Sequence, residues 1–392
     1  MKLLSNLFPL DSINLDARLI RTLLDATESV LDGATLSLTS IGRVSGARNQ
    51  QVEKHTIKRI DRLLGNPAVH NQKARFYQIV ACHFAQEKPL ISVDWSTVYN
   101  YNFVLLRASL AIKGRAVTIY EEVHPEGKMN NHQVHCHFLK NLSKILPQST
   151  QPILCSDAGF KVPWFKEIEK LGWFWLARTR GTVKCHQNDN LGWQYVHTLH
   201  QQATGKAKEL TNFKLSKSHQ LSCRAVINAK PVKKGRKNLN RKGQSTLDRM
   251  NKVYAKSAKE PWILVSNLPS SGYSAHHLVN FYSRRMTIEE SFRDTKDEYY
   301  GLGIMRSRTR SCQRLEIILL IAMLAQLALY VIGKAGELKG YHRYFQANTV
   351  KDRRVLSYAY LGLRLRQHHR FKMTQQELVN ALHLLIQEGE IG

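Results

Sequence analysis

Three acidic residues, far apart in the sequence, are of the type and placement needed to act on a phosphodiester. Asp94 and Asp157 each end an apolar run that is typical of a buried strand, and Glu289 lies in the helical segment 282–296. Mg²⁺ favours carboxylate oxygen and water as ligands. Two such ions about 4 Å apart can activate an attacking oxygen and stabilise a departing one. The three carboxylates therefore predict a two-metal site for phosphodiester chemistry.

The helical segment around Glu289 separates polar from apolar residues. At about 100° per residue, Glu289 shares one stripe with four residues that could contact phosphate oxygens, namely Tyr282, Arg285, Arg293 and Lys296. A second face, suited to packing on a sheet, carries Phe281, Ile288 and Phe292. Glu290 lies off the polar stripe, so we predict Glu289 as the third metal ligand. An ordinary amphipathic helix would show the same periodicity.

The composition restricts the class of partner. The 392 residues include 58 Lys and Arg but only 30 Asp and Glu, which gives a net charge of +28. Such an excess indicates a polyanionic partner, nucleic acid above all, although a basic surface that only aids solubility is an alternative. The 6 cysteines show no C-x-x-C pairing, which favours a reducing cytosol over a disulfide scaffold. A zinc site is not indicated, and the histidine-rich stretch 132–137 receives no role.

The elements expected before residue 82 are helical. Apolar residues recur at intervals of three and four from 15 to about 80, with a turn predicted at 42–46 because two glycines flank it. After this turn one helix face is apolar and another is basic, the basic residues being Lys54, Lys58, Arg59 and Arg62. A basic face opposite an apolar stripe suits a helix lying on DNA. A solvated charged face is the alternative.

The next part of the chain predicts an α/β core. The expected elements are strands at 90–98, 103–112 and 116–123, a helix at 132–146, a strand at 153–157, a helix at 164–171 and a strand at 173–178. This is the order of an RNase H-like core, which carries acidic residues on its first and fourth strands. Asp94 and Asp157 occupy those two strands.

The remaining sequence predicts an insertion and a helical C-terminal region. We expect a helical region that recognises the ends of a DNA segment at 1–82, and the first part of the core at 83–180. A β-rich insertion domain should follow at 181–270, and the core helix with Glu289 at 271–305. The helical region at 306–392 is expected to dimerise. The insertion contains the basic stretch 230–243, predicted as a loop that orders on DNA or else a solubilising loop. The apolar segment 317–333 is shorter than a membrane span, so we predict a buried helix and no membrane. The first 11 residues do not form a convincing signal peptide.

The spacing Tyr282-x2-Arg285-x3-Glu289-x6-Lys296 resembles the Y-R-E-K signature of the insertion-sequence-four family of bacterial DDE transposases. Five further segments are similar to one member of that family, and the resemblance extends over nearly the whole chain: 56–66, 93–96, 156–164, 257–262 and 345–350. The histidine-rich stretch and the composition of 230–243 are not part of the signature.

The resemblance implies a function for the predicted site. Asp94, Asp157 and Glu289 would hold two Mg²⁺ ions, with Mn²⁺ as a substitute, and Tyr282, Arg285 and Lys296 would contact DNA. The implied reaction is cut-and-paste transposition through a nick, a hairpin, hairpin opening and strand transfer. The implied partners are double-stranded DNA, as terminal inverted repeats and target, and a second copy of the chain, in the bacterial cytoplasm on the nucleoid.

A tryptophan of the insertion domain is also implied, because a tight hairpin should push one base out of the stack. Trp262 matches that position, and a buried strand tryptophan is the alternative. Two other functions stay open for the whole chain. One is an RNase H-like, structure-selective or nonspecific nuclease, which would need neither the basic N-terminal helices nor the insertion. The other is an inactive repressor that binds transposon ends and never cuts them.

Overall fold

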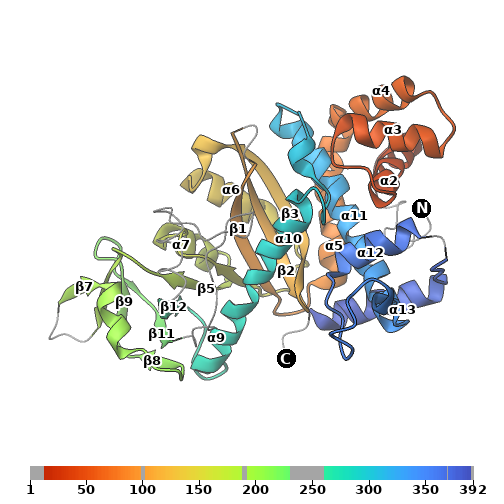
Figure 1. Ribbon diagram of the computed structural model, residues 1–392. Coiled ribbons are helices and arrows are strands. Elements are labelled where there is room, and N and C mark those ends of the chain that lie inside the picture. The colour runs from red at the N-terminus through yellow and green to blue at the C-terminus, as the bar shows by residue number, and fades with distance from the viewer. Residues whose placement is uncertain (1–12, 99–101, 188–191, 230–259, 369, 390–392) are drawn as a thin grey trace, which may run out of the picture. The chain divides into compact units, whose positions relative to one another are not determined.

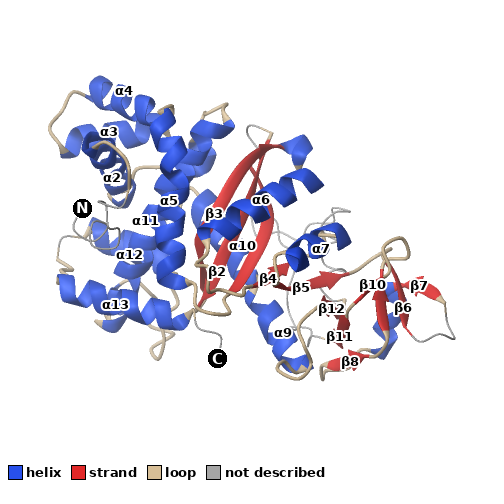
Figure 2. Ribbon diagram, turned by 180° about the vertical axis from the view of Figure 1, so that it is seen from behind, coloured by secondary structure: helices blue, strands red, loops and turns tan. Residues whose placement is uncertain are grey.

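The computed structural model describes residues 13–98, 102–187, 192–229, 260–368 and 370–389 (Figure 1). The chain forms two compact units, one from Met1–Pro152 with Met286–Gly392 and the other from Ile153–Arg285. Both units contain helices and strands (Figure 2). The predicted α/β class is confirmed.

The first unit is built on an antiparallel sheet in the order β3-β2-β1. The strands are β1 (Leu90–Val98), β2 (Phe103–Ile112) and β3 (Arg115–Pro125), and the bounds of β1 and β2 agree with the predicted strands. Gly114 forms the tight turn between β2 and β3 with a φ of +78°, a conformation that favours glycine. β2 is buried from Val104 to Ile112, as expected for the central strand of a covered sheet.

Helices cover both faces of this sheet. Successive strand residues point to opposite faces, so Asp94 and Trp95 of β1 face different helices. The Asp94 face packs on α10 (Met286–Lys296), whereas Trp95 hydrogen bonds to α6 (His132–Ile145). Helix α5 (Pro67–Phe84) also packs on β3, and η2 (Glu126–Lys128) follows β3.

The second unit contains a mixed sheet in the order β4-β5-β12-β11-β8. β4 (Ile153–Ser156) and β5 (Phe174–Thr179) are parallel and are joined by α7 (Val162–Lys170). β12 (Trp262–Ser266), β11 (Arg224–Asn228) and β8 (Lys208–Leu210) continue the sheet with antiparallel pairing. The element order β1-β2-β3-α6-β4-α7-β5 along the chain is the order expected of an RNase H-like core.

The segment predicted as an insertion adds strands in two places. β12, β11 and β8 extend the sheet that starts with β4 and β5. The other strands form a small sheet. Its order is β10 (Leu221–Ser222), β9 (Phe213–Leu215), β6 (Lys184–Gln187) and β7 (Trp193–Tyr195). The 3₁₀ helix η3 (Val196–Gln202) and helix α9 (Ala275–Arg284) also belong to the unit. The basic stretch 230–243 lies outside the described residues.

Within the described residues from 13 onward, four helices precede the sheet of the first unit: α2 (Ala17–Leu31), α3 (Leu38–Arg48), α4 (Glu53–Leu64) and α5. The turn predicted at 42–46 is wrong, because α3 continues through both glycines and the chain turns at 49–52. Gly42 and Gly46 instead let α4 approach closely. The hydroxyl of Thr56 on α4 donates to the carbonyl of Gly42 over 2.7 Å. α3, the four-residue turn and α4 form a helix-turn-helix unit.

We expect Gly42→Ala to destabilise the packing of α3 on α4. An added Cβ would lie 2.6 Å from Ile57 Cγ1 and 2.7 Å from Ile57 Cα, so the backbone of α4 must move. Such overpacking costs about 1–3 kcal/mol, more than the roughly 1 kcal/mol that alanine gains in helix propensity. Thermal unfolding would measure the loss. Gly127→Ala is the control, since a Cβ there meets open space, and equal stability of both variants would contradict the prediction.

The C-terminal part is helical, with α11 (Cys312–Leu338), α12 (Tyr358–Gln367), α13 (Gln375–Glu388) and the 3₁₀ helices η4 (Ile304–Arg306) and η5 (Tyr341–Tyr344). The sequence predicts a break around 333–348, and the break begins later than expected, because α11 runs through Gly333 and ends at Leu338. A Cβ on Gly333 would lie 2.2 Å from the carbonyl oxygen of Tyr358, and one on Gly362 would lie 2.3 Å from that of Leu329. The two glycines therefore allow backbone contact between α11 and α12.

Helix α11 is long and apolar enough to cross a membrane by length and composition alone, with a mean hydropathy of 2.4 over its most apolar window. Yet 89% of that window is buried within the protein. α11 packs on α2, α4, α5, β3, α12 and α13. It is the core helix of the first unit, as predicted.

The helix expected over 282–296 is interrupted at one residue. α9 ends at Arg284 and α10 begins at Met286, with the backbone amide of Arg285 donating to the carbonyl of Tyr282 over 3.1 Å. This bond reaches back three residues, the tighter 3₁₀ pattern. The interruption coincides with the boundary between the two units. The prediction of a single continuous helix is therefore wrong at Arg285.

Candidate active site

Asp94 lies in the middle of β1 and is half-buried. Its Oδ1 accepts a hydrogen bond from the backbone amide of Trp95 over 2.8 Å, which orients the carboxylate. The indole of Trp95 in turn donates to Nε2 of His135 over 3.1 Å. Burial lowers the pKa of His135 to about 4, so its ring stays neutral and can accept this bond. The backbone at Asp94 is thus held by contacts on the opposite face of the sheet.

Glu289 and its neighbour Glu290 have different environments on α10. Glu289 is exposed. Glu290 accepts a hydrogen bond from Arg293 over 2.8 Å and lies 3.9 Å from a guanidinium nitrogen of Arg115. Glu290 therefore takes part in ion pairs within the protein, and this supports Glu289 as the ligand. Ile288 and Phe292 are buried, as the helical periodicity predicts.

Lys296 ties the end of α10 to β1. Its ammonium donates to Ser96 Oγ over 2.8 Å and to the carbonyl of Thr97 over 2.5 Å. Burial, and after it the charge of Arg107, lower the pKa of Lys296 to about 8, against the opposing effect of Asp94. Lys296, which the sequence predicts to contact DNA, thus holds the helix of Glu289 against the strand of Asp94.

Arg107 is the cross-strand partner of Asp94 on β2 and is only 1% exposed. Its Nε donates to Glu121 Oε2 over 2.8 Å, forming a fully buried ion pair. Desolvation raises the pKa of Glu121, and the positive charge of Arg107 opposes that shift. A buried arginine of this kind must be fully hydrogen bonded to be tolerated.

The other nitrogens of Arg107 bind helix α10. Nη1 donates to Ser291 Oγ over 3.2 Å and to Thr295 Oγ1 over 3.3 Å, and the guanidinium lies 4.6 Å from the ring centre of Phe292. Gln326 of α11 reaches the same hydroxyl of Thr295 over 2.9 Å. One side chain therefore joins the strand beside Asp94 to the helix that carries Glu289.

Asp157 belongs to the second unit and directly follows β4. Its Oδ1 accepts a hydrogen bond from the backbone amide of Gly159 over 2.8 Å. A Cβ on Gly159 would lie 2.9 Å from that oxygen, so glycine leaves room for the carboxylate. Because β4 and β5 are parallel with Ser156 opposite Ala177, Asp157 lies at the same sheet edge as Arg178.

Tyr282, Arg285 and Trp262 also lie in the second unit and are buried. The Trp262 ring, 8% exposed, packs edge-to-face on Tyr282 with ring centres 4.8 Å apart. The Arg285 guanidinium lies 5.7 Å from the Tyr282 ring centre. Burial raises the pKa of Tyr282, and the charge of Arg285 opposes that shift. The roles of these residues in DNA binding stay predictions.

The structure thus brings some predicted residues together. Asp94 and Glu289 lie on packed elements of the first unit, with Lys296 and Arg107 between these elements. Asp157 lies in the second unit, so a metal cluster shared by all three carboxylates stays a prediction.

Comparison with known proteins identifies the family. The family described as Transposase DDE domain matches residues 85–326, which is more than half of the 392 residues. The chain belongs to this family. Membership makes it a divalent-metal-dependent enzyme that cuts and joins DNA, and the matched range of the DDE domain contains Asp94, Asp157 and Glu289.

Among solved structures, this chain is similar to a piggyBac transposase in a synaptic complex with hairpin DNA, determined by cryo-electron microscopy. The TM-score is 0.43 and the identity 9%, over 94% of this chain and 75% of that one. No curated protein matches the chain.

The basic residues predicted to bind DNA lie on α4, ahead of the DDE domain. Lys54, Lys58 and Arg62 are exposed. Arg59 is half-buried and donates to Asp25 over 2.8 Å and to Ser45 over 2.9 Å. Arg59 therefore connects α4 to α2 and α3, and its DNA contact remains a prediction.

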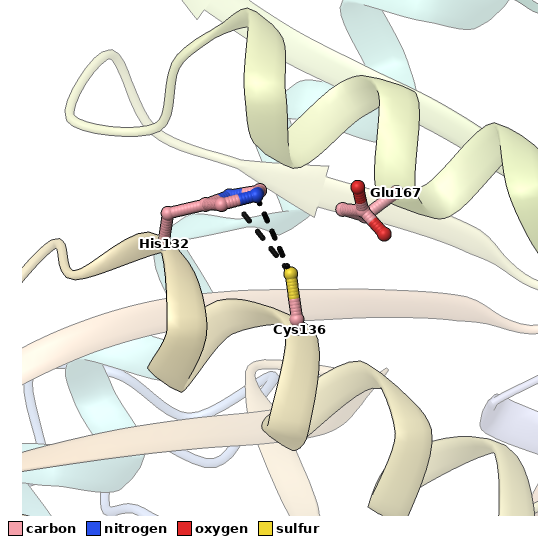
Figure 3. A group of neighbouring side chains, drawn as sticks. All are labelled: His132, Cys136 and Glu167. Atoms are coloured by element: carbon pink, nitrogen blue, oxygen red, sulfur yellow. Dashed lines mark hydrogen bonds between the residues drawn. The ribbon is translucent and has the colours of Figure 1, made fainter.

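The histidine-rich stretch of the DDE domain forms the start of α6. His132 and Cys136 are one turn apart, with Sγ 3.6 Å from Nε2 (Figure 3). His137 lies 3.5 Å from the carboxylate of Glu122, and His135 accepts from Trp95. These contacts give the stretch a structural part in the first unit.

Sequence reasoning missed Arg107 as a residue of the DDE domain site. The signal was present, because Arg107 is the only charged residue in the otherwise apolar segment 103–112. A lone charge in a buried strand requires a buried partner. That partner, Glu121, and the contacts to α10 depend on the pairing of β2 with β3 and on the packing of α10.

Proposed function

We propose that this chain is a DNA transposase that moves its element by a cut-and-paste reaction at terminal inverted repeats. The observation that carries the proposal is the DDE domain match, which spans three carboxylates at strand and helix positions suited to metal binding. The proposed reaction has four steps. One DNA strand is nicked, and the freed 3′-hydroxyl attacks the other strand to form a hairpin. The hairpin is then opened, and the released end is transferred to target DNA.

The residues fit a divalent metal site. Asp94 and Asp157 each have one oxygen oriented by a backbone amide, and Glu289 is exposed on a helix. All three offer the carboxylate oxygens that Mg²⁺ favours and that Mn²⁺ also accepts. When bound, two such ions would activate the attacking oxygen and stabilise the departing one.

The surrounding side chains position these ligands. Lys296 and Arg107 hold α10 against β1 and β2, so that Glu289 is presented on a helix with little freedom to move. Glu290 pairs with Arg293, and Arg115 pairs with Asp294 and lies near Glu290. Catalysis at a phosphodiester depends on such fixed placement, because a misplaced ligand loses much of its effect.

The choice of DNA end is assigned to the helix-turn-helix unit of α3 and α4. α4 buries Ile60 and Leu64 and exposes Lys54, Lys58 and Arg62, as expected of a helix that packs on one side and contacts DNA on the other. Two ends must be paired for strand transfer, so we propose a homodimer in the synaptic complex, with the C-terminal helices as the pairing region. The protein would act in the bacterial cytoplasm on nucleoid DNA.

Within its family, we propose that the chain belongs with the insertion-sequence-four transposases and is close to the transposase of insertion sequence ten. The Y-R-E-K spacing from Tyr282 to Lys296 supports this placement, as do the longer similar segments. It brings Trp262 with it as the residue on which an extruded base would stack. Trp262 is buried against Tyr282 here, so stacking would require its ring to become accessible.

The test is an incubation of the full chain with Mg²⁺ and labelled DNA that ends in the inverted repeats flanking the coding frame. A transposase is expected to give nicked, hairpin and joined products in that order. A nuclease would leave neither hairpin nor joined product. A repressor would bind the repeats in Mg²⁺ and leave them intact, so either outcome overturns the proposal.

A further inference from the structure

A cavity of about 850 Å³ lies within the second unit. It starts at Ala158, the residue after the proposed ligand Asp157, and extends to the turn between β9 and β10. Its size is that of a site for an organic ligand and exceeds what a single ion needs. No acidic residue lines it, among the residues that the structure describes.

Basic residues surround the cavity on several sides. Lys161 directly precedes α7, Arg178 is the last residue but one of β5, Lys184 begins β6, and Lys217 lies in the β9–β10 turn. These residues come from four separate segments, yet all line one space. Such a concentration of cationic groups without a carboxylate favours an anionic ligand, and phosphate oxygens match arginine and lysine donors well.

Arg178 adds positive charge beside the cavity. Its Nε and Nη2 are buried and have no hydrogen-bond partner in the described part of the chain. The carboxylate of Glu260 lies 3.7 Å from Nη2 and gives the guanidinium a charged neighbour. Because neither nitrogen is exposed, these donors do not open into the cavity, and Arg178 acts on it through its positive charge.

An aromatic ring gives the cavity a second kind of contact. Tyr195, at the end of β7, is 42% exposed and lines the cavity. The ammonium of Lys184 lies 5.4 Å from its ring centre. An exposed ring beside cationic groups is the combination that single-stranded nucleic acids use, with bases stacked on the ring and phosphates on the cations. A base within a duplex is already stacked and could not enter the cavity.

We propose that this cavity binds an unpaired nucleotide of the DNA strand being processed, its phosphate at Lys184 and Lys217 and its base beside Tyr195. The inference rests on the proposed function and extends it. The cavity begins beside Asp157, so a strand whose scissile phosphate lies at that carboxylate can continue into it. The site would hold DNA that has left the double helix at the cut end.

The test compares binding of the full chain to two labelled DNAs of unrelated sequence, a blunt duplex and the same duplex with an unpaired extension, in EDTA. The wild type is expected to bind the extended DNA about fivefold or more tightly, the effect of one base–aromatic stack. Tyr195→Ala and Lys217→Ala should each remove most of that preference and leave the affinity for blunt duplex unchanged. Tyr195→Phe should retain it.

Lys206→Ala is the matched control, because Lys206 is exposed in the same unit and does not line the cavity. An equal loss on blunt and extended DNA would overturn the proposal in favour of a general phosphate surface. So would equal effects of Lys206→Ala and Lys217→Ala, or competition by free thymidine monophosphate as strong as by the extension.

A second readout does not depend on affinity. An extension carrying 5-iodouracil should crosslink to Tyr195 on irradiation, and a crosslink elsewhere only would contradict the placement. The assays need neither metal nor terminal repeats. Failure here together with normal hairpin formation would therefore sink this inference alone, whereas absent cleavage with intact binding would sink the proposed function alone.

Discussion

Asp94→Asn is expected to abolish DNA cleavage while binding of transposon ends survives. Asparagine keeps the size of the side chain and can still accept the amide hydrogen of Trp95, but it removes the negative charge that a divalent ion needs. Loss of one group that stabilises charge in a transition state costs about a hundredfold to a thousandfold in rate. Gel-shift assays would measure binding, and denaturing gels of end-labelled DNA in Mg²⁺ would measure cleavage.

The neighbouring glutamates provide a matched control for this experiment. Glu289→Gln should behave as Asp94→Asn does, whereas Glu290→Gln should keep most of the activity because Glu290 is engaged by Arg293 and Arg115. Loss of binding together with cleavage in Asp94→Asn would show a structural role for Asp94. Equal activity of the two glutamate variants would reject Glu289 as a ligand.

Arg107→Met is expected to destabilise the first unit and to impair cleavage. The substitution leaves the carboxylate of Glu121 buried without its arginine, and breaking a buried pair in this way costs about 3–5 kcal/mol. Chemical unfolding would measure the loss. Arg21→Met is the control, because Arg21 is exposed on α2.

The double variant Arg107→Met, Glu121→Leu separates stability from positioning. Replacing both charges with apolar groups should restore most of the stability. Cleavage should stay impaired, since nothing then fastens β2 to Ser291 and Thr295 of α10. DNA-end binding should be normal in the double variant. Recovery of full cleavage along with stability would show that Arg107 has no part in positioning Glu289.

Local pattern was enough to predict most elements of the core. The apolar runs within 90–98 and 103–112 predicted the bounds of β1 and β2, and both strands are buried over most of their length. The helical periodicity likewise predicted that Ile288 and Phe292 would be buried. These signals come from residues close together in sequence.

The predictions from sequence were wrong where contacts between distant parts of the chain determine the structure. Gly42 and Gly333 look like helix breakers, yet each lies inside a helix because another backbone passes where its side chain would be. Such a contact has no local sign. The contacts of Arg107 depend in the same way on strand pairing and on α10. The interruption at Arg285 arises from a single shorter backbone bond.

Helix α11 joins distant parts of the first unit. Its 27 residues span about 40 Å, and along this length it touches the N-terminal helices α2 and α4, the hydroxyl of Thr295 on α10, and the C-terminal helices α12 and α13. A fragment that lacked α2 to α4 would expose to water the side of α11 that these helices cover. We therefore do not expect these helices to be separable from the rest of the unit. If DNA binds to α4 as proposed, a displacement of α4 would be transmitted through α11 to α12 and α13.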